Sequence, residues 1–117
     1  MANSHVITPV ETERMIGTAL RKLDEATTEY AEISRKAAQA EADYRRATAM
    51  KTLALLKHGG FASAKERDAR IELEVSSERE TYLILDAARA SAREHLNSLR
   101  TRIEALRTIS ASVRGQT

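Results

Sequence analysis

The sequence contains no cysteine and has very few aromatic residues, glycines or prolines. Without cysteine it can form no disulfide and has neither a thiol nucleophile nor a thiolate ligand for zinc. Aromatic residues are 3% of its 117 residues, and tryptophan is missing. Layered globular cores normally use more aromatic residues than this, whereas long helices and coiled coils do not. We therefore predict an all-α protein in a reducing, intracellular compartment.

Long apolar runs are missing as well. No segment approaches the roughly 20 consecutive apolar residues that a membrane-spanning helix needs. The segment Met1–Ile7 is polar and lacks the apolar stretch of a signal peptide. We expect a soluble, cytoplasmic protein that has no membrane partner.

Two helix-start signals divide the chain into halves. Thr8-Pro9-Val10-Glu11 and Ser63-Ala64-Lys65-Glu66 both place a glutamate three residues after a hydroxyl side chain. This pattern is a capping box, in which the two side chains satisfy free amides at a helix start. Gly59-Gly60, just before the second box, is the strongest internal helix breaker. These signals predict a helix over 9–57, a turn over 58–63 and a helix over 64–113.

Apolar residues repeat every seven residues along the predicted first helix. One series is Ile16, Leu23, Tyr30, Ala37 and Tyr44, and the other is Ala19, Ala26, Ile33, Ala40, Ala47 and Ala54. The second helix shows a comparable series, although its first third is less regular. The members of this series are Leu85, Ala88, Ala92, Leu96, Leu99, Ile103, Leu106 and Val113. Such a repeat is typical of a left-handed coiled-coil seam. We predict a single domain over 1–117, a coiled-coil-like antiparallel two-helix hairpin in which residue i lies opposite roughly residue 121 minus i.

Several apolar residues fall outside these series. They are Met50, Leu53, Leu55, Leu56, Ile84 and Ile109. Two rods in contact bury one stripe each, so these side chains would stay exposed in a monomer. We therefore predict a homo-oligomer, assembled as a larger helical bundle or a ring.

Basic residues are concentrated near the C-terminus. Residues 87–117 contain six arginines against two acidic residues, Glu94 and Glu104. The candidate nucleic-acid-binding residues are Arg89, Arg93, Arg100, Arg107 and Arg114, of which the last four recur every seven residues. A guanidinium group matches phosphate bidentately and keeps its charge, so this stripe is compatible with a phosphate-binding edge. Arginine is also common beside coiled-coil seams and near helix C-termini, and that interpretation stays open.

No other pattern indicates chemistry. The histidines, His5, His58 and His95, are far apart and have no partners at metal-ligand spacing. The tyrosines, Tyr30, Tyr44 and Tyr82, hold seam positions, which favours core packing over base stacking. We predict no catalytic residues, no metal and no cofactor, and therefore a protein that is not an enzyme.

Three segments carry a resemblance to a known group of proteins. They are residues 92–114 (AREHLNSLRTRIEALRTISASVR), 41–45 (EADYR) and 66–69 (ERDA). Together they look like small all-helical bacteriophage proteins, and the layout is similar to phage recombination mediators of the UvsY-like type. Those proteins form rings, bind single-stranded DNA and help load a recombinase in place of single-strand-binding protein. The resemblance implies a homo-oligomer in the host cytoplasm whose partners are single-stranded DNA and a recombinase or single-strand-binding protein. It also implies DNA contacts at Arg93, Arg100, Arg107 and Arg114.

Two other functions compete with this one. The first is a structural or interaction coiled coil, such as a virion, scaffold or adaptor component, with no nucleic-acid role. In that case the arginine stripe meets an acidic protein surface or solvent. The second is a secreted helical hairpin of the WXG type, which requires Trp-x-Gly at its turn. The absence of tryptophan disfavours it.

Overall fold

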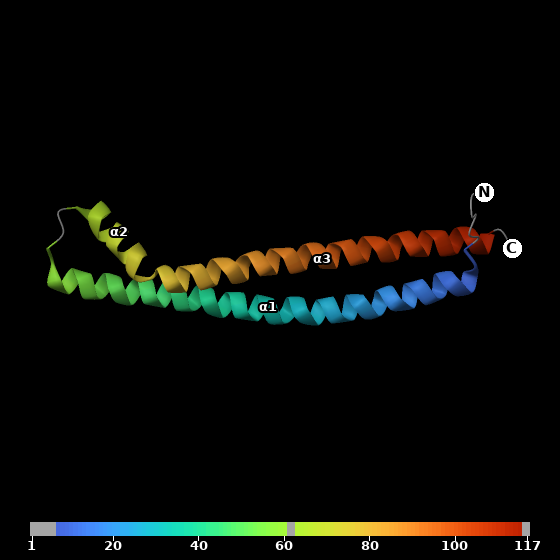
Figure 1. Cartoon of the computed structure of the whole chain (residues 1–117), viewed down its shortest axis with the longest axis horizontal. Coiled ribbons are helices and arrows are strands. Elements are labelled where there is room, and N and C mark those ends of the chain that lie inside the picture. The colour runs from blue at the N-terminus through green and yellow to red at the C-terminus, as the bar shows by residue number, and fades with distance from the viewer. Residues whose placement is uncertain (1–6, 61–62, 116–117) are drawn as a thin grey trace. The chain divides into compact units, whose positions relative to one another are not determined.

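The computed structural model describes residues 7–60 and 63–115, and the elements in these ranges are all helices. They are α1 (Pro9–His58), α2 (Ala64–Glu74) and α3 (Ser76–Gly115), as Figure 1 shows. The predicted all-α fold is confirmed. Residues 1–6, which include His5 and most of the polar segment Met1–Ile7, lie outside the described ranges, as do residues 61–62 of the predicted turn.

The predicted capping box starts α1. The amide of Glu11 donates to the Thr8 hydroxyl at 3.2 Å, and the Thr8 amide donates to the Glu11 carboxylate at 3.4 Å. Two amides that would otherwise lack partners are thus satisfied reciprocally. Thr12, one turn later, is fully buried, and its hydroxyl donates to the Thr8 carbonyl at 3.1 Å. The start of the helix is therefore fixed by chemistry that is local in the sequence.

Glycine ends α1 and serine starts α2. Gly59 and Gly60 have φ angles of 64° and 91°, a region that favours glycine because it carries no Cβ. After the turn, the Glu66 amide donates to the Ser63 hydroxyl at 3.1 Å, which confirms the second N-cap. The first helix ends one residue later than predicted, at His58.

The prediction of one continuous helix over 64–113 is wrong. The helix is divided at Val75, where φ is −104° and ψ is 14°, and α3 then continues to Gly115. Ser76 and Ser77 follow, and serine pairs are a recurrent cause of sharp helix kinks because their side chains compete for backbone groups. Val75 itself is 1% exposed. The break therefore coincides with a core position rather than with a solvent-facing loop.

The contacts of the chain group into two units. The first, here called the terminal unit, consists of Met1–Tyr30 with Ser91–Thr117, and the second, the central unit, is Ala31–Ala90. In each unit, segments of α1 and α3 lie side by side and run antiparallel (Figure 1). The predicted antiparallel helical hairpin is confirmed within each unit.

Small and large side chains oppose each other in the core of the terminal unit. Ala19 packs with Ile103 and Leu106, and Ala26 packs with Leu96 and Leu99. These partners lie within about one helical turn of the predicted register. Alanine lets the two backbones approach closely, while each buried leucine or isoleucine contributes roughly 1.5–3 kcal/mol from removal of its surface from water.

The central unit packs around Ala37, Ala40, Ile71 and Val75, which are all buried. The rings of Tyr44 and Tyr82 stack with centroids 6.0 Å apart and planes 23° from parallel. Both tyrosines are half-buried, so their seam positions place them in a packing contact between α1 and α3 at the edge of the core. The predicted register places Leu73 opposite the alanine-rich segment 37–49 of α1, but this leucine is 76% exposed. Ile71 and Val75 are spaced four residues apart, and a residue midway between them, such as Leu73, points to the opposite side of α2.

Most of the apolar residues outside the seams are exposed to solvent, as expected. They are Met50, Leu53, Leu56, Ile84 and Ile109, whereas Leu55 is half-buried. Their exposure motivates the prediction of self-association, which stays a prediction. Among the described residues, no helix has a stretch both long and apolar enough to cross a lipid bilayer.

Candidate nucleic-acid interface

Four of the five candidate arginines lie on the part of α3 that belongs to the terminal unit, residues 91–115. Leu96, Leu99, Ile103 and Leu106 are buried at alternating spacings of three and four residues. Arg100 and Arg107 each follow a buried leucine by one position, so they emerge on one flank of the seam. Arg93 and Arg114 continue the same seven-residue series along this flank.

Arg93 is engaged with Tyr30. Its guanidinium donates to the Tyr30 hydroxyl at 3.1 Å and lies 6.0 Å from the centre of the ring. The hydrogen bond to Tyr30 raises the pKa of Arg93 above its ordinary value. A cation over a tyrosine ring is also favoured electrostatically. Arg93 is therefore held against α1, although its side chain remains exposed.

Arg114 and Arg89 have acidic partners. The Arg114 guanidinium lies 3.4 Å from the Glu13 carboxylate, and both side chains are about two-thirds exposed. Such exposed pairs contribute little free energy and exchange readily with other anions. Arg89, which belongs to the central unit, is half-buried and paired with Asp86. The positive charge of Arg89 is thus already compensated by the Asp86 carboxylate.

Arg100 and Arg107 stand apart from the other three. Both are exposed, and neither forms a hydrogen bond or an ion pair with any other residue that the structure describes. Glu104 lies one turn from each of them along α3, yet it pairs with neither. Two unpaired guanidinium groups on one helix edge can donate hydrogen bonds to phosphate oxygens without breaking an existing contact.

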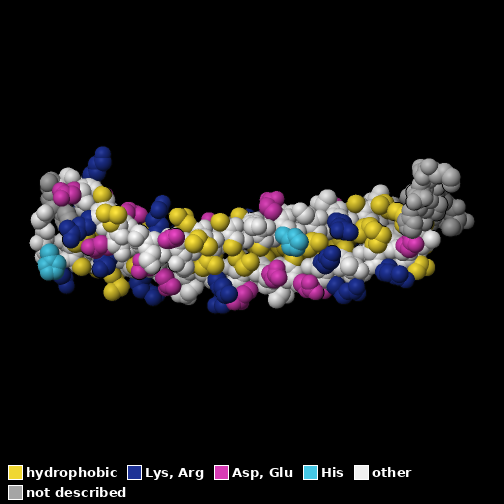
Figure 2. Space-filling model, viewed as in Figure 1, with side chains coloured by type: hydrophobic (Ala, Val, Ile, Leu, Met, Phe, Trp, Pro, Cys, Tyr) yellow, Lys and Arg dark blue, Asp and Glu magenta, His cyan; other side chains and the backbone are white. Residues whose placement is uncertain are grey.

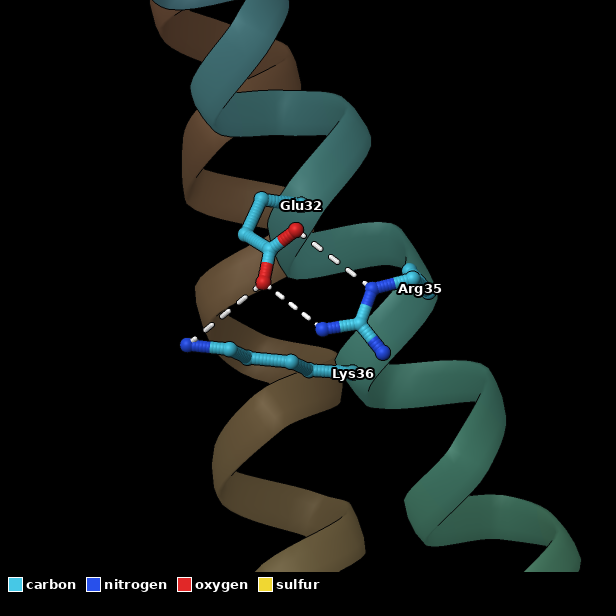
Figure 3. A network of polar contacts seen from close by, with 3 residues as sticks. All are labelled: Glu32, Arg35 and Lys36. Atoms are coloured by element: carbon cyan, nitrogen blue, oxygen red, sulfur yellow. Dashed lines mark hydrogen bonds and ion pairs between the residues drawn. The ribbon is translucent and has the colours of Figure 1, made fainter.

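Some exposed cations of α1 are neutralised by neighbouring carboxylates. Figure 3 shows Glu32 between Arg35 and Lys36, with an oxygen 2.7 Å from Arg35 and 3.9 Å from Lys36. The hydrogen bond from Arg35 lowers the pKa of the Glu32 carboxyl. Arg45 is likewise 2.6 Å from Glu41. Arg100 and Arg107 differ in this respect from Arg35, Lys36 and Arg45, whereas Arg46 and Lys65 of the central unit likewise form no ion pair with a described residue.

A further group of cations lies on the other flank of the same seam and was not expected from the sequence. Arg102, which falls outside the seven-residue series, lines a groove together with Arg14 and Lys22 of α1. On the face of the terminal unit that Figure 2 draws, hydrophobic side chains lie between the helices with basic side chains beside them. The i, i+4 and i+8 spacing of Arg14, Thr18 and Lys22 places them on one face of α1, but only the helix register brings Arg102 to that face.

The structure offers no arrangement for metal binding among the residues that it describes. No group of three or more histidine, aspartate or glutamate side chains is placed to hold a metal ion there. His58 and His95 are exposed and lie in different units. Comparison with family models, curated proteins and solved structures finds no match for this chain.

Proposed function

We propose that this chain is a non-enzymatic accessory protein that binds the backbone of single-stranded DNA. The observation that carries the proposal is the pair Arg100 and Arg107, exposed and without a partner among the described residues. Arg93, Arg114 and Arg89 contribute less, because each already has a partner.

The chemistry of the pair suits a repeating polyanion. Arginine presents a planar fork of donors that binds phosphate oxygens bidentately, and its charge does not titrate in the physiological range. Seven residues of helix separate the two side chains by roughly 10.5 Å along α3. A phosphate chain running along the helix edge would meet both guanidinium groups.

The resemblance to UvsY-like mediators adds a cellular role to the proposal. A protein of that type acts in the host cytoplasm, loads a recombinase onto DNA and displaces single-strand-binding protein. Self-association would repeat the arginine edge around an assembly and multiply its weak contacts. The mediator role is tested by recombinase loading onto DNA coated with single-strand-binding protein, with and without this chain.

The DNA contact itself is tested by fluorescence anisotropy with labelled single-stranded and duplex oligonucleotides across a salt series. We expect tighter binding to the single strand and a logarithmic salt slope of about 0.7 for each phosphate contacted. Arg100→Gln/Arg107→Gln should lower that slope by about 1.4. A matched control is Arg46→Gln/Lys65→Gln, which removes two exposed cations of the central unit that lack partners among the described residues. Absence of binding at low salt, or an equal loss in both variants, would contradict the proposal.

A second candidate function is that of a structural or interaction coiled coil. It is favoured by an exposed apolar patch on α3, where Leu83, Ile84 and Ala87 line an open groove of about 460 Å³ with Ser76, Arg79 and Glu80. Analytical ultracentrifugation of the wild type and Ile84→Glu tests it. A particle mass that falls in the variant, together with no DNA binding in the wild type, would favour this function over the first.

A further inference from the structure

The groove on the second flank of the terminal unit has the composition of an anion site. It has a volume of about 180 Å³, and its lining includes three cations, Arg14, Lys22 and Arg102, and no acidic residue. None of these three forms an ion pair with a described residue. Arg21 adds a fourth cation close to the groove, because its guanidinium donates to the Thr18 hydroxyl at 3.2 Å.

The hydroxyl of Thr18 distinguishes this groove from a merely basic surface. Threonines in helices usually donate to the carbonyl four residues earlier. Eight threonines of the described helices do so, at positions 12, 27, 28, 48, 52, 81, 101 and 108. Thr18 is the exception among the helical threonines that the structure describes, and it lines the groove. Its hydrogen remains available to a bound acceptor.

The floor of the groove is apolar. Met15, Ala19 and Leu99 line it, and Ala19 and Leu99 are buried in the seam beneath. A cavity of roughly 150 Å³ lined by apolar side chains accepts a benzene ring. The groove therefore has room for one ring or a short alkyl chain beside its cations.

We propose that this groove binds a phosphate monoester whose apolar group is about the size of one aromatic ring. A phosphate monoester carries about two negative charges and three acceptor oxygens at neutral pH, which matches several cationic donors and one hydroxyl better than a carboxylate does. The apolar group lies on Met15 and Leu99 while the phosphate contacts Arg14, Lys22 and Arg102.

This site is separate from the proposed DNA edge. Arg102 follows Arg100 by two residues, which turns it by about 200° around the axis of α3. The two arginines therefore lie on opposite flanks of the seam formed by Leu99 and Ile103. The proposal does not depend on DNA binding, and it is tested with its own ligand.

Phenyl phosphate titrated into the ¹⁵N-labelled full chain at low salt, followed by NMR, tests the proposal. We expect saturable shifts of amide resonances confined to residues 14–22 and 98–103. Inorganic phosphate and benzyl alcohol, which each supply half of the ligand, should bind about tenfold more weakly or not at all. Butyl phosphate in parallel distinguishes a flat aromatic group from an aliphatic one. Shifts that do not saturate, or equal affinity for inorganic phosphate, would overturn the proposal.

Three variants connect the binding to the named groups. Arg14→Gln/Arg102→Gln should abolish saturation, and Thr18→Val, which keeps the side-chain shape, should weaken binding several-fold. The matched control is Arg100→Gln/Arg107→Gln, which removes two arginines from the other flank and should leave the affinity unchanged. Circular dichroism of each variant confirms that the helices are intact. An equal loss in the control, or full affinity in Arg14→Gln/Arg102→Gln, would show attraction by diffuse charge in place of a site.

Discussion

The guanidinium of Arg93 donates a hydrogen bond to the Tyr30 hydroxyl and lies over the ring of the same tyrosine. This pair joins α3 to α1 across sixty-three positions of sequence. Arg93 therefore stabilises the pairing of the two helices. Arg100 and Arg107 of the same stripe make no such contact with a described residue and are available to a ligand.

The first prediction separates these two roles. Arg93→Gln should lower the thermal unfolding midpoint and change the salt slope of DNA binding little, because Arg93 is held by Tyr30. Arg100→Gln should leave the midpoint unchanged and lower the slope by about 0.7. Circular dichroism and fluorescence anisotropy measure the two quantities.

Tyr30→Phe is the control for this comparison. It keeps the ring beneath Arg93 and removes the hydrogen-bond acceptor, so it should lower the midpoint without lowering the salt slope. If Arg93→Gln and Arg100→Gln reduce the slope equally, Arg93 is not held as described.

The second prediction concerns pH and Tyr44 in the central unit. Partial burial raises the pKa of the Tyr44 phenol, and so does its hydrogen bond to the Glu72 carboxylate at 3.2 Å; Arg79 opposes both effects. Because the folded-state pKa is the higher one, the protonated phenol favours the folded state. This contribution to stability is complete below the unfolded pKa of about 10 and is lost as the pH rises through the folded pKa.

Urea unfolding at a series of alkaline pH values measures this effect. The wild type should lose stability above about pH 10 more steeply than Tyr44→Phe, which has no phenol to ionise at this position. Tyr82→Phe leaves the Tyr44–Glu72 hydrogen bond in place and should follow the wild type. Parallel curves for the wild type and Tyr44→Phe would contradict the assignment.

Local chemistry explains why the helix limits were predictable from sequence. The Thr8–Glu11 box, the Ser63 cap and the Gly59 turn act over three or four residues, so their partners are visible in the sequence itself. The break at Val75 was not predicted, because a buried Val75 and the outward position of Leu73 depend on how α2 packs against α1. The irregular seam of the predicted second helix was the available signal.

The candidate site was predictable only in part, for a similar reason. The spacing of Arg100 and Arg107 follows from the heptad repeat. The heptad repeat does not show which arginines already have a partner within the protein, because the partner of Arg93 comes from a distant part of the chain. Likewise, the groove at Arg102 exists only because the antiparallel register places it beside Arg14 and Lys22.

The third prediction compares two leucines. Leu99 is 6% exposed in the core of the terminal unit, and Leu73 is 76% exposed on α2. Leu99→Ala should lower the free energy of unfolding by about 2–4 kcal/mol, since it removes buried surface and leaves a cavity. Leu73→Ala should change it by less than about 0.5 kcal/mol. Urea denaturation measures both. A comparable cost at position 73 would show that this leucine is covered in solution, as it would be in an oligomer.

The fourth prediction compares two glycines under the same substitution. Gly17 lies within α1, and a Cβ built there meets no atom within 4 Å, so Gly17→Ala gains helix propensity at no steric cost. We expect it to raise the free energy of unfolding by about 0.5–1 kcal/mol. Gly59 has a φ of 64°, a region in which a side chain crowds the following carbonyl. Gly59→Ala should therefore lower that free energy by about 1–2 kcal/mol, and a stabilising effect would mean that α1 does not end at this turn.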